Sequence, residues 1–191
     1  MCSRPAISGL THPSCHKRYG IDGVFSSLVY KGVTKKLIYQ FKFEPYLSDL
    51  SSTLGELLYE GIIQQEAFFK AQNSNAILVP IPLHKSRYRK RGYNQALLLA
   101  GDLGKRLAMP VRPLLTREKL TKTQVGLTLE ERRENIKGAF ALESKELQLS
   151  EMTIFLVDDI LTSGATLAEA AKVLKKAGAE KVWGITLAHG S

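Results

Sequence analysis

The segment Thr153–Thr166, TIFLVDDILTSGAT, restricts the possible folds of this chain more than any other. A run of apolar residues stops at two adjacent carboxylates, Asp158 and Asp159, and passes directly into hydroxyl residues and a glycine. A short apolar run with such an end is typical of a buried strand in a parallel sheet. The residues Thr166–Ala177 then have helical spacing, with Gly178 placed as the stop at the C-terminus of the helix. The segment therefore predicts a strand, a loop and a helix, which is the repeating unit of an α/β fold.

The pattern of strand and helix extends over residues 75–191. Apolar strands that alternate with helices predict an α/β domain with a mainly parallel sheet. The elements that we expect besides the first segment are strands at Ala76–Pro80, Val111–Leu115 and Lys181–Ala188 and a helix at Gln95–Leu107.

A long polar connection, Arg117–Lys137, interrupts this pattern. Only its second half has helical character, and Thr128 and Glu131 are spaced as a capping box at the start of that helix. A polar connection of this length is more often a functional loop than a filler. We therefore expect it to contribute to a binding site.

The first 74 residues predict two smaller units. Residues 1–23 are rich in Gly, Pro, Ser, Cys and His without a sustained period, and they indicate an irregular or metal-braced segment. Residues 24–74 predict an N-terminal cap, with a strand at Val24–Tyr30 and helices at Thr34–Phe43 and Leu50–Phe69. The expected organisation is thus 1–23, a cap at 24–74 and a core domain at 75–191.

Charge and composition limit the class of protein. With 191 residues, 44% of them hydrophobic, the chain is long enough to bury a core. The net charge of +9, from 27 basic and 18 acidic residues, indicates a partner that carries phosphate, either a nucleotide or a nucleic acid. Neither a membrane span nor a signal peptide is recognisable, so we expect a cytoplasmic protein without a membrane partner. Two cysteines make no disulfide framework and leave metal binding as the alternative to free thiols.

The end of the Thr153–Thr166 segment has the chemistry of a ligand site. In open α/β sheets, ligands bind beyond the carboxyl ends of the strands, so we expect Asp158 and Asp159 to face a crevice. The next residues, Thr162–Thr166, lead to a helix N-terminus, where backbone N–H groups favour a phosphate. The carboxylates would then accept hydrogen bonds from sugar hydroxyls or help to position Mg²⁺. A cap and turn without a ligand is the alternative for a bare pair of aspartates.

Three segments in this order resemble a known family. The string FLVDDILTSGAT closely resembles the signature with which type I phosphoribosyltransferases bind phosphoribosyl pyrophosphate (PRPP). VPIPLHKSRYRKRGYNQALLLA (Val79–Ala100) and REKLTKTQVGLTLEERRENIKGAF (Arg117–Phe140) resemble two further segments of the ComF family, which are competence-associated, phosphoribosyltransferase-like proteins. YKGVTKKLIYQFKF (Tyr30–Phe43) is similar to the family's helix ahead of the core. The resemblance covers essentially the whole chain and implies a type I phosphoribosyltransferase fold with an N-terminal helical cap and a partial zinc-ribbon-like N-terminus.

The resemblance also implies roles for individual residues. The catalytic acids that hold the ribose hydroxyls would be Asp158 and Asp159. The 5′-phosphate loop would consist of Thr162, Ser163, Gly164, Ala165 and Thr166. The pyrophosphate loop would lie at Pro82–Arg87, with Lys85 and Arg87 as its cations, while Arg91, Asn94 and Gln95 match family positions to which the sequence assigns no role. The flexible loop that closes over PRPP would carry Arg117, Gln124, Arg132 and Asn135.

The implied function is the binding of PRPP with Mg²⁺ and the transfer of phosphoribosyl to an unidentified acceptor, linked to natural competence and DNA uptake. Pyrophosphate would leave from C1 of the sugar through a cation-like state, stabilised by magnesium and basic side chains. PRPP binding is the firmer expectation, because the resemblance implies no defined acceptor for ComF proteins.

A second hypothesis starts from HKSRYRKRGY (His84–Tyr93), which packs five basic residues around Tyr88 and Tyr93. Basic groups that follow a backbone and aromatic rings that stack on bases suit single-stranded DNA. The chain would then be a non-catalytic, DNA-binding competence factor that retains the fold and has competence proteins as partners. A solvated helix start with the tyrosines packed inward is the alternative, and the same basic residues could serve pyrophosphate.

The N-terminus partly matches the family's zinc ribbon, which has two C-x-x-C pairs. CSRP at Cys2 matches the second half of the first pair, and His12 to Cys15 form H-x-x-C in place of the second. The resemblance implies Cys2, His12 and Cys15 as zinc ligands, whereas a structural site needs four. His16 or a residue upstream of Cys2 would supply the fourth, and free thiols are the alternative.

Overall fold

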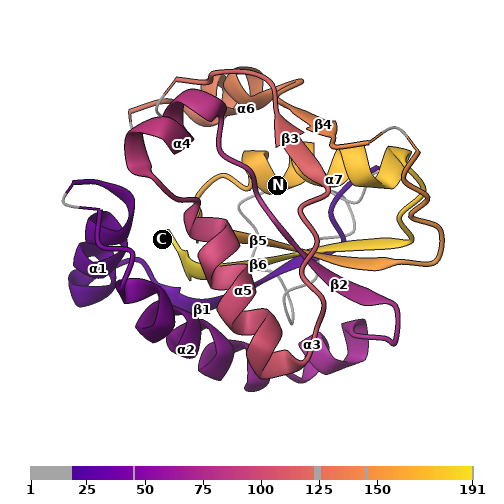
Figure 1. Cartoon of the computed structure of the whole chain (residues 1–191), viewed down its shortest axis with the longest axis horizontal. Coiled ribbons are helices and arrows are strands. Elements are labelled where there is room, and N and C mark those ends of the chain that lie inside the picture. Colours follow the sequence, from indigo (N-terminus) through magenta and orange to yellow (C-terminus); the bar gives the residue numbers. More distant parts are fainter. Residues whose placement is uncertain (1–18, 45, 123–125, 145, 191) are drawn as a thin grey trace.

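The computed structural model describes residues 19–44, 46–122, 126–144 and 146–190. Its centre is a sheet of four parallel strands in the order β1-β6-β5-β2 (Figure 1). These strands are β1 (Gly23–Val29), β2 (Ala76–Pro80), β5 (Thr153–Leu161) and β6 (Lys181–His189). The predicted α/β class with a mainly parallel sheet is confirmed.

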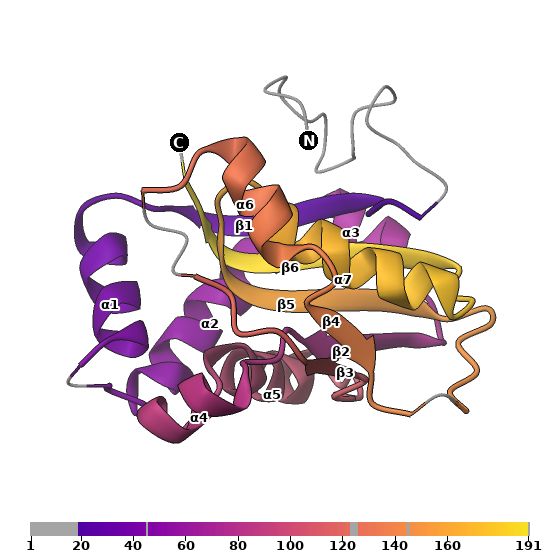
Figure 2. The same cartoon turned by 90° about the horizontal axis from the view of Figure 1, so that it is seen from above.

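Helices cover both faces of the sheet (Figures 1 and 2). One face packs against α1 (Gly32–Lys42), α2 (Leu50–Ile63), α3 (Glu66–Ala71) and α5 (Gln95–Leu107). The other packs against α7 (Ala165–Lys176), α6 (Leu129–Ile136) and a short antiparallel pair, β3 (Leu115–Arg117) and β4 (Phe140–Leu142). The remaining helix, α4 (Lys85–Arg91), follows β2 at the edge of the molecule where α1 also lies.

Strand β5 explains why its sequence is apolar without alternation. Phe155 and Val157 pack on the side of α2 and α5, and Ile154 and Leu156 pack on the side of α7. All four are fully buried, because helices cover the strand from both sides. The two sides of the sheet therefore have separate cores, and successive residues of β5 alternate between them.

The predicted helix Leu50–Phe69 is interrupted in the structure, because α2 ends at Ile63 and α3 begins at Glu66. Gln65 has an extended backbone, and its side-chain amide donates to the carbonyls of Gly61 and Ser26. This turn directs Phe68 into the core, where its ring packs against Phe155. The interruption of the helix thus allows the aromatic side chain of Phe68 to be buried, which stabilises the fold.

The predicted strand Val111–Leu115 is also wrong in extent. Val111 makes only an isolated bridge to Leu78, and β3 begins at Leu115. Pro110 and Pro113 lack backbone N–H groups, so this stretch cannot continue a ladder. The strand β4 was not expected from the sequence, and α4 lies in the segment His84–Tyr93, for which a solvated helix start was one of the two alternatives.

The remaining predicted elements are confirmed to within two residues, apart from the end of the strand that begins at Thr153; they include the helix Gln95–Leu107 and the capping box of Thr128 and Glu131. The strand at the start of the predicted cap, β1, is the edge strand of the main sheet, so the sheet contains residues from both sides of the boundary predicted at residue 75. Within the part of the chain that the structure describes, no helix has the length and apolar character needed to cross a bilayer.

Candidate functional site

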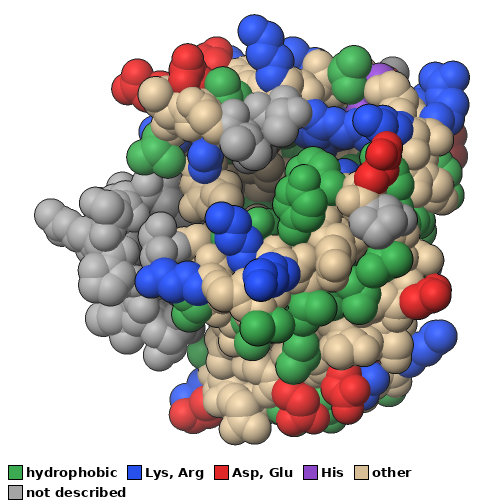
Figure 3. Space-filling view, turned by 90° about the vertical axis from the view of Figure 1, so that its left-hand side faces the viewer, with side chains coloured by type: hydrophobic (Ala, Val, Ile, Leu, Met, Phe, Trp, Pro, Cys, Tyr) green, Lys and Arg blue, Asp and Glu red, His purple; other side chains and the backbone are tan. Residues whose placement is uncertain are grey.

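A cleft with a volume of about 300 Å³ opens at the carboxyl ends of the strands. It lies on the face of the molecule that carries α1 and α4, which is hollowed and has Lys and Arg side chains around the hollow (Figure 3). The cleft exists because β2 ends at Pro80, opposite Val157, while β5 continues to Leu161 along β6. The edge of β5 beyond Val157 is therefore not covered by a neighbouring strand on that side.

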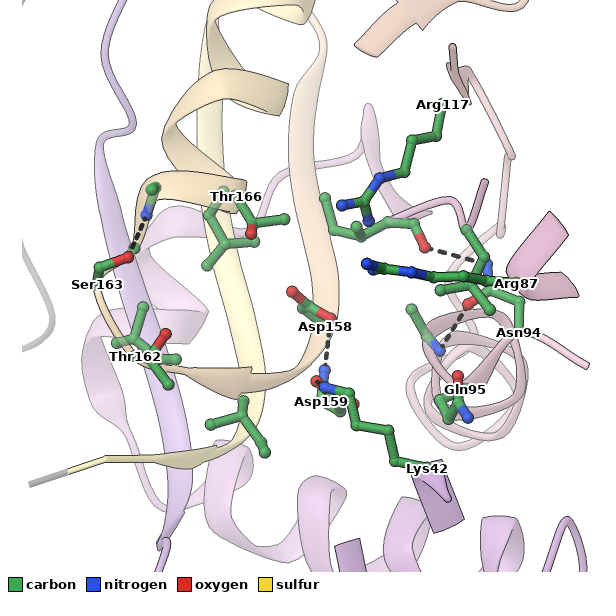
Figure 4. A pocket seen from close by; sticks show the side chains of 18 of the residues that line it. Lys42, Arg87, Asn94, Gln95, Arg117, Asp158, Asp159, Thr162, Ser163 and Thr166 are labelled. Atoms are coloured by element: carbon green, nitrogen blue, oxygen red, sulfur yellow. Dashed lines mark hydrogen bonds and ion pairs between the residues drawn. The ribbon is translucent and has the colours of Figure 1, made fainter. Parts of the chain in front are cut away.

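The two carboxylates lie inside β5 and not after it, which corrects the expectation that the strand stops at Val157. Asp158 is opposite Thr186 in the ladder with β6, and Asp159 follows it in the same extended strand. Because side chains alternate along a strand, Asp158 lies on the α7 side and Asp159 on the α1 and α5 side. Figure 4 shows the two carboxylates directed to different parts of the cleft. They are thus a pair in the sequence but have different neighbours.

Asp158 lies at the centre of the cleft, between the loop Thr162–Thr166 and the arginines (Figure 4). One of its oxygens accepts a hydrogen bond of 2.9 Å from the backbone N–H of Asp159. Burial, and then the neighbouring charge of Asp159, raise the pKa of Asp158 to about 7, against the attraction of Lys42 and Arg117. The protonated form of Asp158 is therefore favoured more than that of an exposed aspartate.

Asp159 is 5% exposed and forms an ion pair with Lys42 at the end of α1. The Nζ of Lys42 lies 2.9 Å from Oδ1 and 2.8 Å from Oδ2 of the carboxylate. The sequence reading missed Lys42, because a lysine in the last turn of an amphipathic helix also has the ordinary role of complementing the helix dipole. Tyr30 and Phe43, from the ends of the segment that resembles the family's leading helix, line the cleft as well.

Arginines gather on the side of the cleft opposite the loop. Arg87 from α4 and Arg117 from β3 both donate to Thr121, to its carbonyl at 2.6 Å and to its hydroxyl at 2.6 Å respectively. Burial lowers the pKa of both guanidinium groups, that of Arg117 to about 10 with the charge of Arg87 as the second cause. Both stay charged at neutral pH. Arg132 from α6 also lines the cleft.

Arg117 is the most confined of these cations. Its guanidinium carbon lies 5.5 Å from the centre of the Phe140 ring, and its Nε is buried without a hydrogen-bond partner among the described residues. Arg87 and Arg117 form no ion pair with a carboxylate of the described chain. Partly buried cations without anionic partners carry a desolvation cost, and an anionic ligand would relieve that cost.

The loop Thr162–Thr166 lies on the other side of Asp158 and leads into α7. Gly164 has φ +69°, in the left-handed region that favours glycine, and α7 begins at the next residue. All five residues of the loop line the cleft. The first turn of a helix presents backbone N–H groups that have no acceptor within the helix, and its dipole favours an anion. The arrangement can hold a phosphate.

The residues that the sequence left without a role, Arg91, Asn94 and Gln95, form the base of the cleft. The Gln95 side chain is buried, accepts a hydrogen bond from Arg91 and donates to the carbonyl of Phe41 at 2.8 Å. Asn94 caps α5 by accepting from the N–H of Ala96, and it donates to the carbonyl of Ile81 at 3.0 Å. These residues connect the end of α1 and the loop after β2 to the start of α5.

Some of the predicted site residues lie elsewhere. Lys85 is exposed and does not line the cleft. Asn135 does not line it either; its side chain holds the backbone of Lys122 through both the N–H and the carbonyl. The other predicted residues, Gln124 and the candidate zinc ligands Cys2, His12 and Cys15, lie outside the described residues, as does His16.

The described residues of the cleft offer few side-chain ligands for Mg²⁺. Mg²⁺ is usually bound by one or two carboxylates, with water and substrate phosphates completing its shell. Asp158 offers one such carboxylate, and the described residues contain no group of three or more His, Cys, Asp and Glu that could hold a metal ion by itself. Asp158 is thus the residue that would hold a magnesium ion carried by a phosphorylated ligand.

Comparisons with known proteins show which proteins this chain is similar to. The family model of the phosphoribosyl transferase domain matches residues 94–190. Competence protein F of Haemophilus influenzae is 38% identical over 155 residues, which cover 80% of this chain and 67% of that protein. DNA utilization protein YhgH of Escherichia coli K12 is 35% identical, and the match covers 76% of this chain and 63% of that protein. Competence protein ComFC of Bacillus subtilis 168 is 31% identical, and the match covers 85% of this chain and 62% of that protein.

The chain therefore spans about two thirds of the length of these relatives. The family model covers β5, α7 and β6 together with the carboxylates and the loop after them. The match with Competence protein F extends over most of the chain and confirms the resemblance seen in the sequence. This chain belongs to the ComF family, and its core has the type I phosphoribosyltransferase fold.

Proposed function

We propose that the cleft binds PRPP, or a related phosphoribosyl ligand, with Mg²⁺. The observation that carries the proposal is the placement of Asp158 between the loop at the start of α7 on one side and the partly buried cations Arg87 and Arg117 on the other. A ligand that fits this order has a phosphate at each end and hydroxyl groups between them. PRPP has this chemistry.

In the proposed complex, the 5′-phosphate lies on the loop Thr162–Thr166 at the start of α7. Asp158 accepts hydrogen bonds from the ribose hydroxyls, and the pyrophosphate extends toward Arg87 and Arg117. Bound magnesium would neutralise part of the pyrophosphate charge. The two arginines then gain the anionic partner that the described chain does not supply.

Transfer of the sugar phosphate would break the bond between C1 and the pyrophosphate oxygen and form a bond from C1 to an acceptor, which loses a proton. The residues of this cleft would contribute by stabilising the departing charge and by excluding water. The competence and DNA-utilization names of the relatives support a role linked to DNA uptake or use. The proposal names no acceptor, so the binding of PRPP is the part that is tested first.

The test compares two basic residues of α4, one inside the cleft and one outside it. Calorimetric titration with PRPP and Mg²⁺ is expected to give one site in the wild type. Arg87→Ala is expected to weaken binding at least about tenfold, because charge-assisted hydrogen bonds to a phosphate contribute about 1.5 kcal/mol or more each. Lys85→Ala, the matched control, is expected to stay within about twofold, because exposed charges are screened. No heat with the wild type, or equal effects of the two variants, would contradict the proposal.

A second candidate function is the binding of single-stranded DNA by the outer face of α4. Arg87 and Arg91 line the cleft, whereas Lys85, Arg89 and Lys90 are exposed around Tyr88, which is itself 49% exposed. An exposed aromatic ring among cations suits a stacked base and its phosphates. This face is separate from the cleft residues, so α4 could serve both ligands.

The two functions can be separated by substitution. Replacement of Lys85, Arg89 and Lys90 by Ala is expected to weaken the binding of a fluorescent oligo-dT at low salt and to leave PRPP binding within about twofold. Arg87→Ala is expected to do the reverse. Oligo-dT binding that is unaffected by the triple replacement would remove this face of α4 as a DNA site.

A further inference from the structure

The ion pair between Lys42 and Asp159 has no part in the proposed ligand contacts. It joins the last residue of α1 to the middle of β5, across 117 positions of the chain. Both oxygens of the Asp159 carboxylate lie within 2.9 Å of the same ammonium group. The side chain of Lys42 is one third exposed, and that of Asp159 is 8% exposed. The pair therefore stands at the wall of the cleft, with its carboxylate end buried.

Several contacts hold Lys42 in this place. The preceding residue, Phe41, is fully buried, and its ring packs against Tyr93. The carbonyl of Phe41 accepts hydrogen bonds from the Tyr93 hydroxyl at 2.9 Å and from the Gln95 side chain at 2.8 Å. The end of α1 is thus attached to the start of α5, which places the backbone of Lys42 within reach of Asp159.

The consequence for the carboxylate pair is electrostatic. Asp158 and Asp159 are adjacent in a cleft that is proposed to receive a polyanion, and two uncompensated carboxylates would repel it. An ammonium group in contact with both oxygens of one carboxylate cancels that charge. A divalent cation beside Asp159 would have the same effect, but the ammonium group already occupies that position.

We propose that Lys42 is a positioning residue that takes the place of a divalent cation beside Asp159, so that a ligand entering the cleft meets Asp158 as its one available carboxylate. The inference rests on the proposed function for the identity of the ligand. It makes a separate statement about metal binding, which can be tested without any phosphoribosyl compound.

The experiment measures Mn²⁺ binding to the full chain by electron paramagnetic resonance, in the absence of PRPP. The wild type is expected to bind Mn²⁺ weakly, and Lys42→Met is expected to bind it at least about tenfold more tightly, because two uncompensated carboxylates attract a divalent cation. Lys42→Arg is expected to behave as the wild type, because it restores a cation beside Asp159. Lys42→Met combined with Asp159→Asn is expected to lose the gain.

Two results would overturn the inference: Mn²⁺ affinity of Lys42→Met equal to that of the wild type, or a gain that persists after Asp159→Asn. A merely structural role of the ion pair would lower thermal stability without changing metal affinity, so melting curves of all variants accompany the titrations. Lys42→Gln, which keeps a polar side chain of similar length, replaces Lys42→Met if the latter does not fold. Failure of the proposed function is seen separately, as the absence of PRPP binding to the wild type.

Discussion

Asp158 and Asp159 show how two identical neighbours in the sequence acquire different chemistry. Asp159 faces a lysine and is held as an ion pair, whereas Asp158 faces the open cleft and has a raised pKa. The alternation of side chains along β5 is the cause, because it directs the two carboxylates to opposite sides of the sheet. The charge state of a carboxylate in this cleft therefore depends on its neighbours as well as on its residue type.

Asp158→Asn is expected to make the protein more stable at about pH 8 and to change little near pH 4 to 5. A carboxyl whose pKa is about 7 in the folded state and about 4 in the unfolded chain contributes stability that is complete below about pH 4 and is lost as the pH rises through about 7. Asparagine has no charge to desolvate. Since one pKa unit corresponds to about 1.4 kcal/mol and the residue is partly exposed, we expect a gain of at least about 1 kcal/mol at pH 8.

Urea denaturation at about pH 5 and pH 8 measures this difference. Asp49→Asn, an exposed aspartate just before α2, is the control and is expected to differ little from the wild type at both pH values. An Asp158→Asn gain of the same size at both pH values would contradict the proposed cause.

Arg117→Met is expected to separate stability from ligand binding. The buried Nε of Arg117 has no partner among the described residues, so removal of the guanidinium group relieves a desolvation cost while methionine fills the space beside Phe140. We expect the free energy of unfolding to fall by no more than about 1 kcal/mol, or to rise, and the affinity for pyrophosphate to fall at least about tenfold. Denaturation and calorimetry check the two parts, with the exposed Arg112→Met as control. Loss of stability with unchanged affinity would show that Arg117 has a purely structural role.

At the scale of elements, α2 packs closely on β1. Because α1 precedes α2 in the chain and lies on the same face of the sheet, this packing also helps to place the end of α1. Gly61 of α2 lies against Ser27 of β1, where an added Cβ would come within 2.7 Å of the Ser27 Cα. Only glycine allows this approach. Gly101, in the interior of α5, has nothing within 4 Å of an added Cβ.

Gly61→Ala and Gly101→Ala are therefore expected to have opposite effects. The first forces backbone atoms apart and is expected to destabilise the protein by about 1–3 kcal/mol. The second fills open space in a helix and is expected to stabilise it by about 0.5–1 kcal/mol, through helix propensity. Thermal and urea denaturation of the two variants form a matched test. Equal effects would mean that the packing of α2 on β1 is looser than described.

Other elements show which signals in a sequence are local. The capping box of α6 and the stop of α7 at Gly178 depend on residues within one turn, and both agree with the structure. The break between α2 and α3 does not depend on neighbouring residues alone, because it goes with the burial of Phe68 against strands far away in the chain. Pro110 and Pro113 are a local signal against a strand in that segment.

At the scale of the whole molecule, the net charge is +9, and the cleft also has more cations than anions: it is lined by two carboxylates and by Lys42, Arg87, Arg91, Arg117 and Arg132. Anions should therefore stabilise the folded state, and pyrophosphate more than phosphate. A ligand at a hundred times its Kd stabilises by about 2.7 kcal/mol, which is about 5–10 °C in melting temperature for a chain of this size. The shift is expected to shrink between about 50 mM and 300 mM salt.

Thermal denaturation with increasing pyrophosphate measures this effect. The variant Arg87→Ala should reduce the shift, and Lys85→Ala should leave it in place. A shift of equal size in all three proteins would place the anion outside the cleft.

The sequence by itself determined several of the elements and the residue types at their ends. The strand, loop and helix of Thr153–Ala177 and the helix Gln95–Leu107 depend on periodicity and turn residues within short windows, which the chain encodes locally. The family resemblance depends on short sequence motifs. Only the tertiary structure decided which groups meet. Lys42 reaches Asp159 because α1 is attached to α5, and Arg117 reaches the cleft because β3 pairs with β4 beyond α7. Such contacts follow from the packing of distant segments, to which no local pattern is sensitive.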